Sequence, residues 1–168
     1  MFEKGTVWAY PTDTSFGLGV RVDDEAGLQA LKAIKRRPES KYFSVMVRDI
    51  DMLCEYAEVP ILLTLDFFIE KPRTVLLKPS KKMPKSPFWP IDSVAFRVCL
   101  LPEIAQHITM PVTTTSANIS SFPAIFSVRE LRSTFGDNIK IYDAIPELPR
   151  SAPSEIWDFT VTPRQQIR

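Results

Sequence analysis

The sequence is poor in the residue types that most enzymes use for nucleophilic or metal chemistry. It holds one histidine and two cysteines among 168 residues. Cys54 and Cys99 are too few and too far apart for a disulfide framework or a Cys-x-x-Cys metal site, and we expect both to be small core residues. His107 lies in an apolar helical pattern, so any Ser-His-Asp triad or histidine-rich metal site has at most one candidate. We therefore expect a structural histidine and no metal site built from side chains.

The scarcity of glycine narrows how the chain can bind phosphate groups. There are five glycines, and none forms a Gly-x-x-x-x-Gly-Lys-[Ser/Thr] loop. Gly17-x-Gly19 lacks the third glycine of a dinucleotide-binding fingerprint. If the protein binds phosphates, cationic side chains must therefore do much of the holding.

Long apolar segments are also missing. The longest apolar run, residues 59–69, contains Asp66 and is too short to span a bilayer. Residues 1–5 lack the basic-then-apolar order of a signal peptide, so we expect a cytoplasmic protein that contacts no membrane. Hydrophobic residues make up 45% of the chain and charged residues 24%, which is typical of a globular protein. A chain of this length fits one domain, over residues 1–168.

Positive charge is concentrated in two stretches, although the net charge of +1 predicts no overall attraction to nucleic acid. Residues 32–48 hold six lysines and arginines against one acid, Glu39. Residues 71–85 hold six and no acid. For the second stretch, a solvated surface face and a phosphate-contacting patch are both open.

The order of predicted elements alternates between strands and helices, which indicates an α/β fold with helices packed on a largely parallel or mixed sheet. Pro38 limits the first helix, and Gly136 ends the last. We expect strands over 6–10, 17–22, 43–47, 74–77, 94–100, 112–115, 139–142 and 156–160. We expect helices over 24–37, 50–56, 61–69, 102–108 and 127–135.

The first candidate site is the cationic segment Lys35-Arg36-Arg37-Pro38. Pro38 biases Arg37 towards an extended conformation, in which residues two apart point to the same side. Lys35 and Arg37 could then converge on one anion. The alternative is that they only complement the negative end of the helix dipole.

Two polar turns follow predicted strands and share that ambiguity. Residues 113–118 read TTTSAN, and residues 10–14 read YPTDT. Hydroxyl and amide groups at the end of a strand suit a polar ligand. They are equally typical of turns that satisfy their own backbone.

Taken together, five segments resemble the YrdC-like family of threonylcarbamoyl-adenylate synthases. They read YPTDTSFGLG from Tyr10, KRRP from Lys35, DSVAFRV from Asp92, SAN from Ser116 and PSEI from Pro153. The family carries a YPTDT-x-[YF]GLG start, a K-x-R-P loop, a D-[ST]-[VL]-A-[VF]-R-[VM] strand, an S-A-N loop and a P-S-x-I element. Each motif is short, but five in this order make a chance match improbable.

The resemblance implies a nucleotidyltransferase of the L-threonylcarbamoyladenylate synthase type. Such an enzyme joins L-threonine, bicarbonate and ATP into threonylcarbamoyl-adenylate and pyrophosphate, the first step towards threonylcarbamoyladenosine (t6A) in tRNA. The implied fold is a twisted, open, mixed α/β sheet with helices packed on it and a basic concave cavity. Mg²⁺ is expected to accompany ATP. The implied partners are the proteins of the t6A transferase complex, which would receive the adenylate.

The resemblance also assigns residues. Lys35 and Arg37 are the implied catalytic residues. The implied nucleotide-binding residues are Lys35, Arg37, Lys41, Ser93, Thr115, Ser116, Asn118 and Arg168. The implied threonine-binding residues are Thr12, Thr14, Arg97 and Ser154.

The sequence departs from the family at three places. Family members usually have a helix before the first strand, whereas here the first expected strand begins at residue 6. The family's W-P-G-P-[LV]-T turn reads EKPRT over residues 70–74, and Met46 replaces a histidine that some members have. These changes bear on activity and threonine selectivity more than on the fold.

Two other functions share parts of this pattern. One is a non-catalytic YrdC-like module that binds double-stranded RNA or tRNA and uses residues 71–85 to contact phosphates. The other is the hydrogenase-maturation type, which normally has acylphosphatase and zinc elements that are absent here. The Ser-x-Asn loop favours the synthase, because duplex RNA requires positive charge but not that loop.

Overall fold

The computed structural model describes residues 1–168 and consists of one mixed sheet with helices packed on it. The strands are β1 (Trp8–Pro11), β2 (Phe16–Gly19), β3 (Ser44–Val47), β4 (Arg73–Leu77), β5 (Val94–Val98), β6 (Val112–Ser116), β7 (Lys140–Ile141), β8 (Glu155–Asp158) and β9 (Gln165–Gln166). The α-helices are α1 (Glu25–Lys35), α2 (Ile50–Tyr56), α3 (Leu65–Ile69), α4 (Pro102–Ala105) and α5 (Val128–Phe135), and a short 3-10 helix follows over Gly136–Asn138. None of these helices combines the length and apolar character needed to cross a bilayer.

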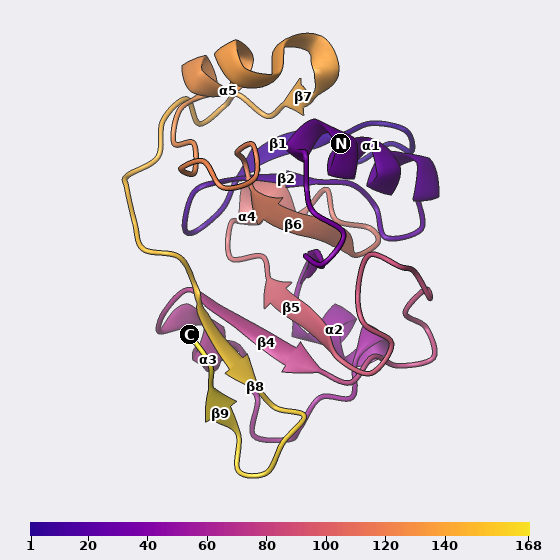
Figure 1. The fold of residues 1–168 in the computed structure, drawn as a ribbon. Helices are drawn as coiled ribbons and strands as arrows, with labels where there is room; N and C mark the ends of the chain where they lie inside the picture. The colour runs from indigo at the N-terminus through magenta and orange to yellow at the C-terminus, as the bar shows by residue number, and fades with distance from the viewer.

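The sheet is open and has the order β7-β1-β2-β6-β3-β5-β4-β8-β9. Three neighbouring pairs, β1 with β7, β3 with β5 and β4 with β8, are parallel, and the other pairs are antiparallel. The expected open mixed sheet is therefore confirmed. In Figure 1 the first half, β7-β1-β2-β6, lies beside α1 and α5, and the second half lies beside α2 and α3.

The two faces of the sheet differ in character. Along β5, the side chains of Val94, Phe96 and Val98 are buried, whereas those of Ala95 and Arg97 between them are half-buried. This alternation follows from the strand geometry, which points successive side chains to opposite faces. The buried face contributes to a single core of 37 hydrophobic residues. The other face is free to line a cavity.

A connecting segment joins the two halves. Residues 143–154 run from β7 to β8 in an irregular conformation, visible in Figure 1 as the long orange-yellow stretch along one side. Ser151 Oγ donates a hydrogen bond of 2.6 Å to the carbonyl oxygen of Thr14. The segment is thereby fastened to the turn between β1 and β2.

Three details differ from the sequence-based expectations. Cys54 is exposed on α2 instead of buried, and Cys99 is half-buried. The helix expected over 61–69 begins at Leu65, because Pro60 starts a turn closed by a hydrogen bond from Leu63 N to Pro60 O. β9 was not expected, since two glutamines have no strand pattern of their own.

Candidate functional site

A cavity of about 580 Å³ lies on the open face of the sheet, where its two halves meet. Its lining includes three arginines, Arg37, Arg97 and Arg168, and no aspartate or glutamate. Many of the other lining residues carry hydroxyl groups. A set of guanidinium groups beside hydroxyl donors, with no carboxylate among the lining residues, suits an anionic, polar ligand. The basic concave cavity that the family resemblance implied is therefore present.

The end of α1 brings Lys35 and Arg37 to this site. The helix ends at Lys35, and Arg36 adopts a left-handed conformation with φ 49°. Arg36 N donates to Ala33 O and Arg37 N to Lys32 O, which closes the last turn. We predicted that Lys35 and Arg37 would converge because Pro38 makes the chain extended at Arg37. In the structure, the left-handed conformation of Arg36 also contributes to this convergence.

Lys35 lies beneath the loop that follows β6. Its side chain is 1% exposed, and Nζ donates three hydrogen bonds, to Ser116 O (2.5 Å), Asn118 O (2.9 Å) and Asn118 Oδ1 (2.8 Å). Burial, together with the neighbouring Arg37, lowers the pKa of Lys35 to about 7. Ser116 Oγ also donates to Asn118 Oδ1 at 3.0 Å. Lys35 thus holds the Ser116–Asn118 loop in shape.

Arg37 lines the cavity directly. Its guanidinium group donates to Lys41 O (3.0 Å), to Tyr42 O and to Thr115 Oγ1 (3.3 Å), and it lies 4.8 Å from the centroid of the Phe43 ring. Burial lowers the pKa of Arg37. These contacts fix the direction of its charge.

A second group of residues forms the opposite side of the cavity. Arg97 on β5 pairs with Asp13 and contacts Thr14 Oγ1 at 3.5 Å. Thr12 Oγ1 and Thr14 Oγ1 lie 3.1 Å apart in the turn between β1 and β2. This turn and β5 together present two hydroxyls and one guanidinium to the cavity.

The third side is made by β4 and the C-terminal strands. Thr74 Oγ1 and Ser154 Oγ form a buried hydrogen bond of 2.9 Å. Arg168 Nε and Nη2 donate to Ser154 O at 3.2 and 3.0 Å. Residues far apart in the sequence therefore meet around one cavity.

Most of the predicted site residues lie at this cavity. Thr12, Thr14, Arg37, Arg97, Thr115, Ser116, Asn118, Ser154 and Arg168 line it. Lys35 lies directly behind them, in contact with Ser116 and Asn118.

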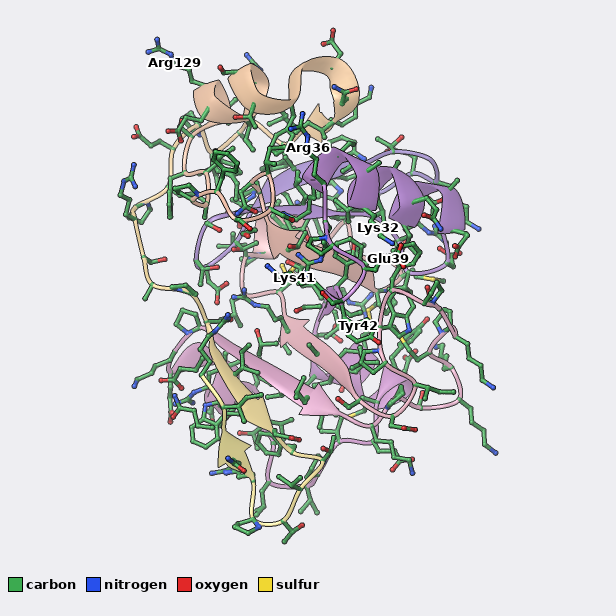
Figure 2. All side chains as sticks on the ribbon, viewed as in Figure 1. Lys32, Arg36, Glu39, Lys41, Tyr42 and Arg129 are labelled. Carbon is green, nitrogen blue, oxygen red and sulfur yellow. The ribbon has the colours of Figure 1, made fainter.

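Two predicted nucleotide-binding residues are not among the lining residues. Ser93 lines a separate hollow with Lys78 and Phe159, because the pairing of Val94 with Leu77 carries it past the far end of β4. Lys41 is exposed in the loop after α1, where Figure 2 labels it, and it meets Arg37 through its backbone oxygen. The structure does not bring these two side chains to the cavity, and their part in nucleotide binding stays a prediction.

Sequence reasoning missed four residues. Asp13 pairs with Arg97, while Thr74, Tyr42 and Phe126 line the cavity. Asp13 belongs to the YPTDT segment of residues 10–14, where it is the one carboxylate, and an ion pair with an arginine of a basic cavity could have been expected of it. Thr74, Tyr42 and Phe126 reach the site only through strand pairing and loop placement.

The basic stretch over residues 71–85 is largely neutralised by acids from other parts of the chain. Lys71 pairs with Glu155, Lys78 with Glu58, and Lys82 with Glu55. Arg73 pairs with both Glu70 and Glu155. These ion pairs support the solvated-face interpretation. His107 lies outside the cavity, 6.4 Å from the Tyr142 ring between centroids, as expected of a structural histidine.

Comparisons with known proteins agree with this geometry. A threonylcarbamoyl-AMP synthase of Pseudoalteromonas translucida is 30% identical over 163 residues, which cover 92% of this chain and 87% of that protein. The protein of the same name from Psychromonas ingrahamii is 31% identical over 161 residues, covering 90% of this chain and 84% of the other.

Two solved structures share the fold. Sua5 of P. abyssi, solved in complex with L-threonine, superposes with a TM-score of 0.84 at 26% identity, and the match covers 98% of this chain. This chain spans only 50% of that Sua5 chain. E. coli YciO superposes with a TM-score of 0.81 at 22% identity, covering 98% of this chain and 82% of YciO, which shows the fold alone.

The sequence model of one family, Sua5/YciO/YrdC, with the description "telomere recombination", matches residues 1–168. With the fold and the relatives in agreement, this chain belongs to the Sua5/YciO/YrdC family.

Proposed function

We propose that this protein is an enzyme that forms L-threonylcarbamoyl-adenylate and pyrophosphate from ATP, L-threonine and bicarbonate. The observation that carries the proposal is the cavity: three guanidinium groups and the Lys35-bound Ser116–Asn118 loop face one hollow that no carboxylate lines. The curated relatives that bear the name threonylcarbamoyl-AMP synthase support the same conclusion.

The chemistry fits these residue types. The amine of L-threonine and bicarbonate first give a carbamate, with loss of water. A carbamate oxygen then attacks the α-phosphorus of ATP, and the bond from that phosphorus to the bridging oxygen of the β-phosphate breaks, so that pyrophosphate leaves. Preorganised cations lower such a barrier, because negative charge grows on the phosphate oxygens. The carbamate is already an anion, so the attack needs no histidine base.

We assign the lining residues of the cavity to the two substrates. Arg37, Thr115, Ser116, Asn118 and Arg168 would contact the nucleotide phosphates, with Lys35 holding the loop. The hydroxyls of Thr12, Thr14 and Ser154, with Arg97, would contact threonine, whose carboxylate and hydroxyl match guanidinium and hydroxyl partners.

Mg²⁺ would enter with ATP and supply charge neutralisation to its phosphates. The residues fit this mode, since no group of three or more His, Cys, Asp or Glu side chains could hold a metal on its own. Asp13, the carboxylate nearest to the lining arginines, is committed to its ion pair with Arg97. In this proposal the protein's own groups would bind the nucleotide, and Mg²⁺ would supply charge neutralisation to its phosphates.

The product is a mixed anhydride that other proteins must consume. We propose that the t6A transferase proteins take the adenylate and pass the threonylcarbamoyl group to adenosine in tRNA. Direct binding of double-stranded RNA is not part of this proposal, because the cations of residues 71–85 are mostly paired.

The test is pyrophosphate release from ATP in the presence of Mg²⁺, bicarbonate and L-threonine, repeated without threonine. We expect threonine-dependent release, reduced at least about 100-fold by Arg37→Ala, a loss typical of removing a charge-stabilising donor. Arg36→Ala is the matched control, because Arg36 is exposed, is adjacent to Arg37 and does not line the cavity. The proposal would be wrong if the wild-type protein released pyrophosphate at the same rate with and without threonine.

A further inference from the structure

The cavity wall formed by β4 and β8 has an outer face that no part of the proposed mechanism uses. The two strands are parallel, with Arg73 opposite Glu155 and Thr74 opposite Ile156. Since neighbouring side chains on a strand point to opposite faces, Thr74, Ser154 and Ile156 face the cavity. Arg73, Glu155 and Trp157 therefore face away from it.

On this outer face, charged and aromatic side chains form one continuous cluster. Its members, which we call the outer cluster, are Phe67, Arg73, Glu155, Trp157 and Arg164. Arg73 Nε lies 3.0 Å from Glu155 Oε2, and its guanidinium carbon lies 4.3 Å from the centroid of the Phe67 ring. Hydrogen bonds from Trp157, Arg73 and Lys71 lower the pKa of Glu155 to about 2, so its carboxylate stays ionised at neutral pH.

Arg164 completes the cluster from the C-terminal hairpin. Its guanidinium carbon lies 5.6 Å from the Phe67 ring centroid, 5.8 Å from that of Trp157 and 5.4 Å from that of Phe159. Arg164 makes no ion pair with a carboxylate. Three aromatic rings around one guanidinium form a favourable cation–π arrangement.

The position of Arg164 in the hairpin links the cluster to the cavity. It immediately precedes β9, which pairs with β8 through Trp157 opposite Gln166. Two residues after β9, Arg168 N contacts Ile156 O at 3.3 Å, and the Arg168 side chain donates to Ser154 O. Arg164 of the outer cluster therefore lies just before β9, and Arg168, just after β9, lines the cavity.

We propose that Arg73, Glu155 and Arg164 are positioning residues of the substrate site, which hold β8 and β9 in register and thereby hold Ser154 and Arg168 in the cavity. The inference rests on the proposed function, in which Ser154 and Arg168 contact the substrates. Arg73 and Glu70 lie in the segment that departs from the family's W-P-G-P turn. In this chain, the contacts of the cluster join the C-terminal hairpin to α3 and β4.

The test compares Arg164→Gln, which keeps a long polar side chain without the charge, with Arg164→Lys, which restores the charge over the rings. Lys82→Gln is the matched control, because Lys82 Nζ also lies over an aromatic ring, 4.9 Å from the Tyr56 centroid, although it is paired with Glu55 as well, and Lys82 does not line the cavity. Two properties are measured: hydrogen exchange of the amides over residues 155–168, and the KM for ATP and kcat of pyrophosphate release.

We expect Arg164→Gln to speed hydrogen exchange over residues 155–168. The KM for ATP should rise about three- to tenfold, which is the equivalent of losing one or two cation–π contacts. The kcat should change less than about twofold. Arg164→Lys should recover most of both effects, and Lys82→Gln should change neither.

Two results would overturn the inference alone: exchange that is unchanged in Arg164→Gln, or faster exchange with an unchanged KM in an active enzyme. Wild type that neither binds ATP nor releases pyrophosphate would overturn the proposed function, and the positioning role with it.

Discussion

Lys35 is an unusual residue in this structure, because it buries an amine that has three oxygen acceptors and no carboxylate partner. A buried ammonium costs free energy unless it is paired and hydrogen-bonded. Two backbone oxygens and one amide oxygen meet the hydrogen-bonding part of this requirement, but no anion compensates the charge. The pKa of Lys35 falls to about 7 for that reason.

The lowered pKa predicts a pH dependence of stability. Between pH 7 and the ordinary lysine value near 10.4, the unfolded state binds more protons at this position than the folded state, so stability rises with pH. The free energy of unfolding of wild type, relative to Lys35→Met, should therefore increase by up to about 2 kcal/mol between pH 7 and 9.

The measurement is denaturant unfolding of both proteins at several pH values. Only the difference in slope is compared, so a general loss of stability in Lys35→Met does not affect the result. A difference that stays flat or falls over this range would contradict the lowered pKa.

At the residue scale, the resemblance to a known family placed the Lys35–Arg37 and Ser116–Asn118 pairs in one site, which the residues alone left open. Neither the resemblance nor the residues showed that Lys35 would be buried behind the Ser116–Asn118 loop while Arg37 lines the cavity. That distinction depends on the left-handed conformation of Arg36, which a non-glycine residue rarely adopts and which no sequence pattern announced.

At the scale of the secondary-structure elements, the antiparallel strands β2 and β6 lie very close to each other beside the cavity. Gly17 pairs with Ser116 and Leu18 with Thr115, so β2 lies against the strand that leads into the Ser116–Asn118 loop. At Gly19, a Cβ atom would lie 2.1 Å from Thr113 O. Because that oxygen belongs to the backbone of β6, no side-chain movement can relieve the overlap.

We expect Gly19→Ala to destabilise the protein by about 2–4 kcal/mol, as overpacking against a backbone does. Gly5→Ala is the control: a Cβ there meets nothing within 4 Å, and the positive φ of 77° costs about 1 kcal/mol. Chemical denaturation of both variants measures the difference. Equal losses would mean that β2 can move away from β6 without penalty.

Each expected strand and helix has a counterpart in the structure, and the errors lie at the ends. The strand patterns at β3 and β6 were clear because apolar and β-branched residues are continuous there. β7 was expected over 139–142 and is shorter, Lys140–Ile141, whereas β9 has only two glutamines, whose side chains give no strand signal. The outer cluster was equally hidden, since its members come from α3, β4 and the C-terminal hairpin.

At the scale of the whole molecule, the cavity joins the two halves of the sheet. Arg37 follows α1 and Arg168 follows β9, so residues from both halves line the cavity, and a substrate bound as we propose would contact both. A ligand that binds only the folded state stabilises it in proportion to its saturation.

We expect ATP at about 100 times its Kd to stabilise the protein by about 2.7 kcal/mol and to raise Tm by roughly 5–10 °C. L-threonine should raise Tm further. L-valine is the control for threonine, because it has the same shape without the hydroxyl that Thr12, Thr14 or Ser154 would bind. Thermal unfolding with each ligand tests this expectation. If valine raises Tm as much as threonine does, the hydroxyls of Thr12, Thr14 and Ser154 do not recognise threonine.

The strand order was the part of the fold that sequence reasoning alone left open. β3 lies between β6 and β5, and β4 pairs with β8 as well as with β5, so five of the eight neighbouring pairs join strands that are not consecutive in sequence. Hydrophobic periodicity predicts that a strand exists, but not which strand it joins. The resemblance to a known family supplied the architecture that the patterns could not.

The two-residue strands at either margin of the sheet bear on how copies of this protein behave towards one another. β7 and β9 are the two edge strands of the nine-stranded open sheet, and each offers few free backbone groups to a neighbouring molecule. Long, flat margins invite intermolecular strand pairing, and short ones discourage it. Concentrated solutions of the folded protein should therefore resist polymerisation through their sheets.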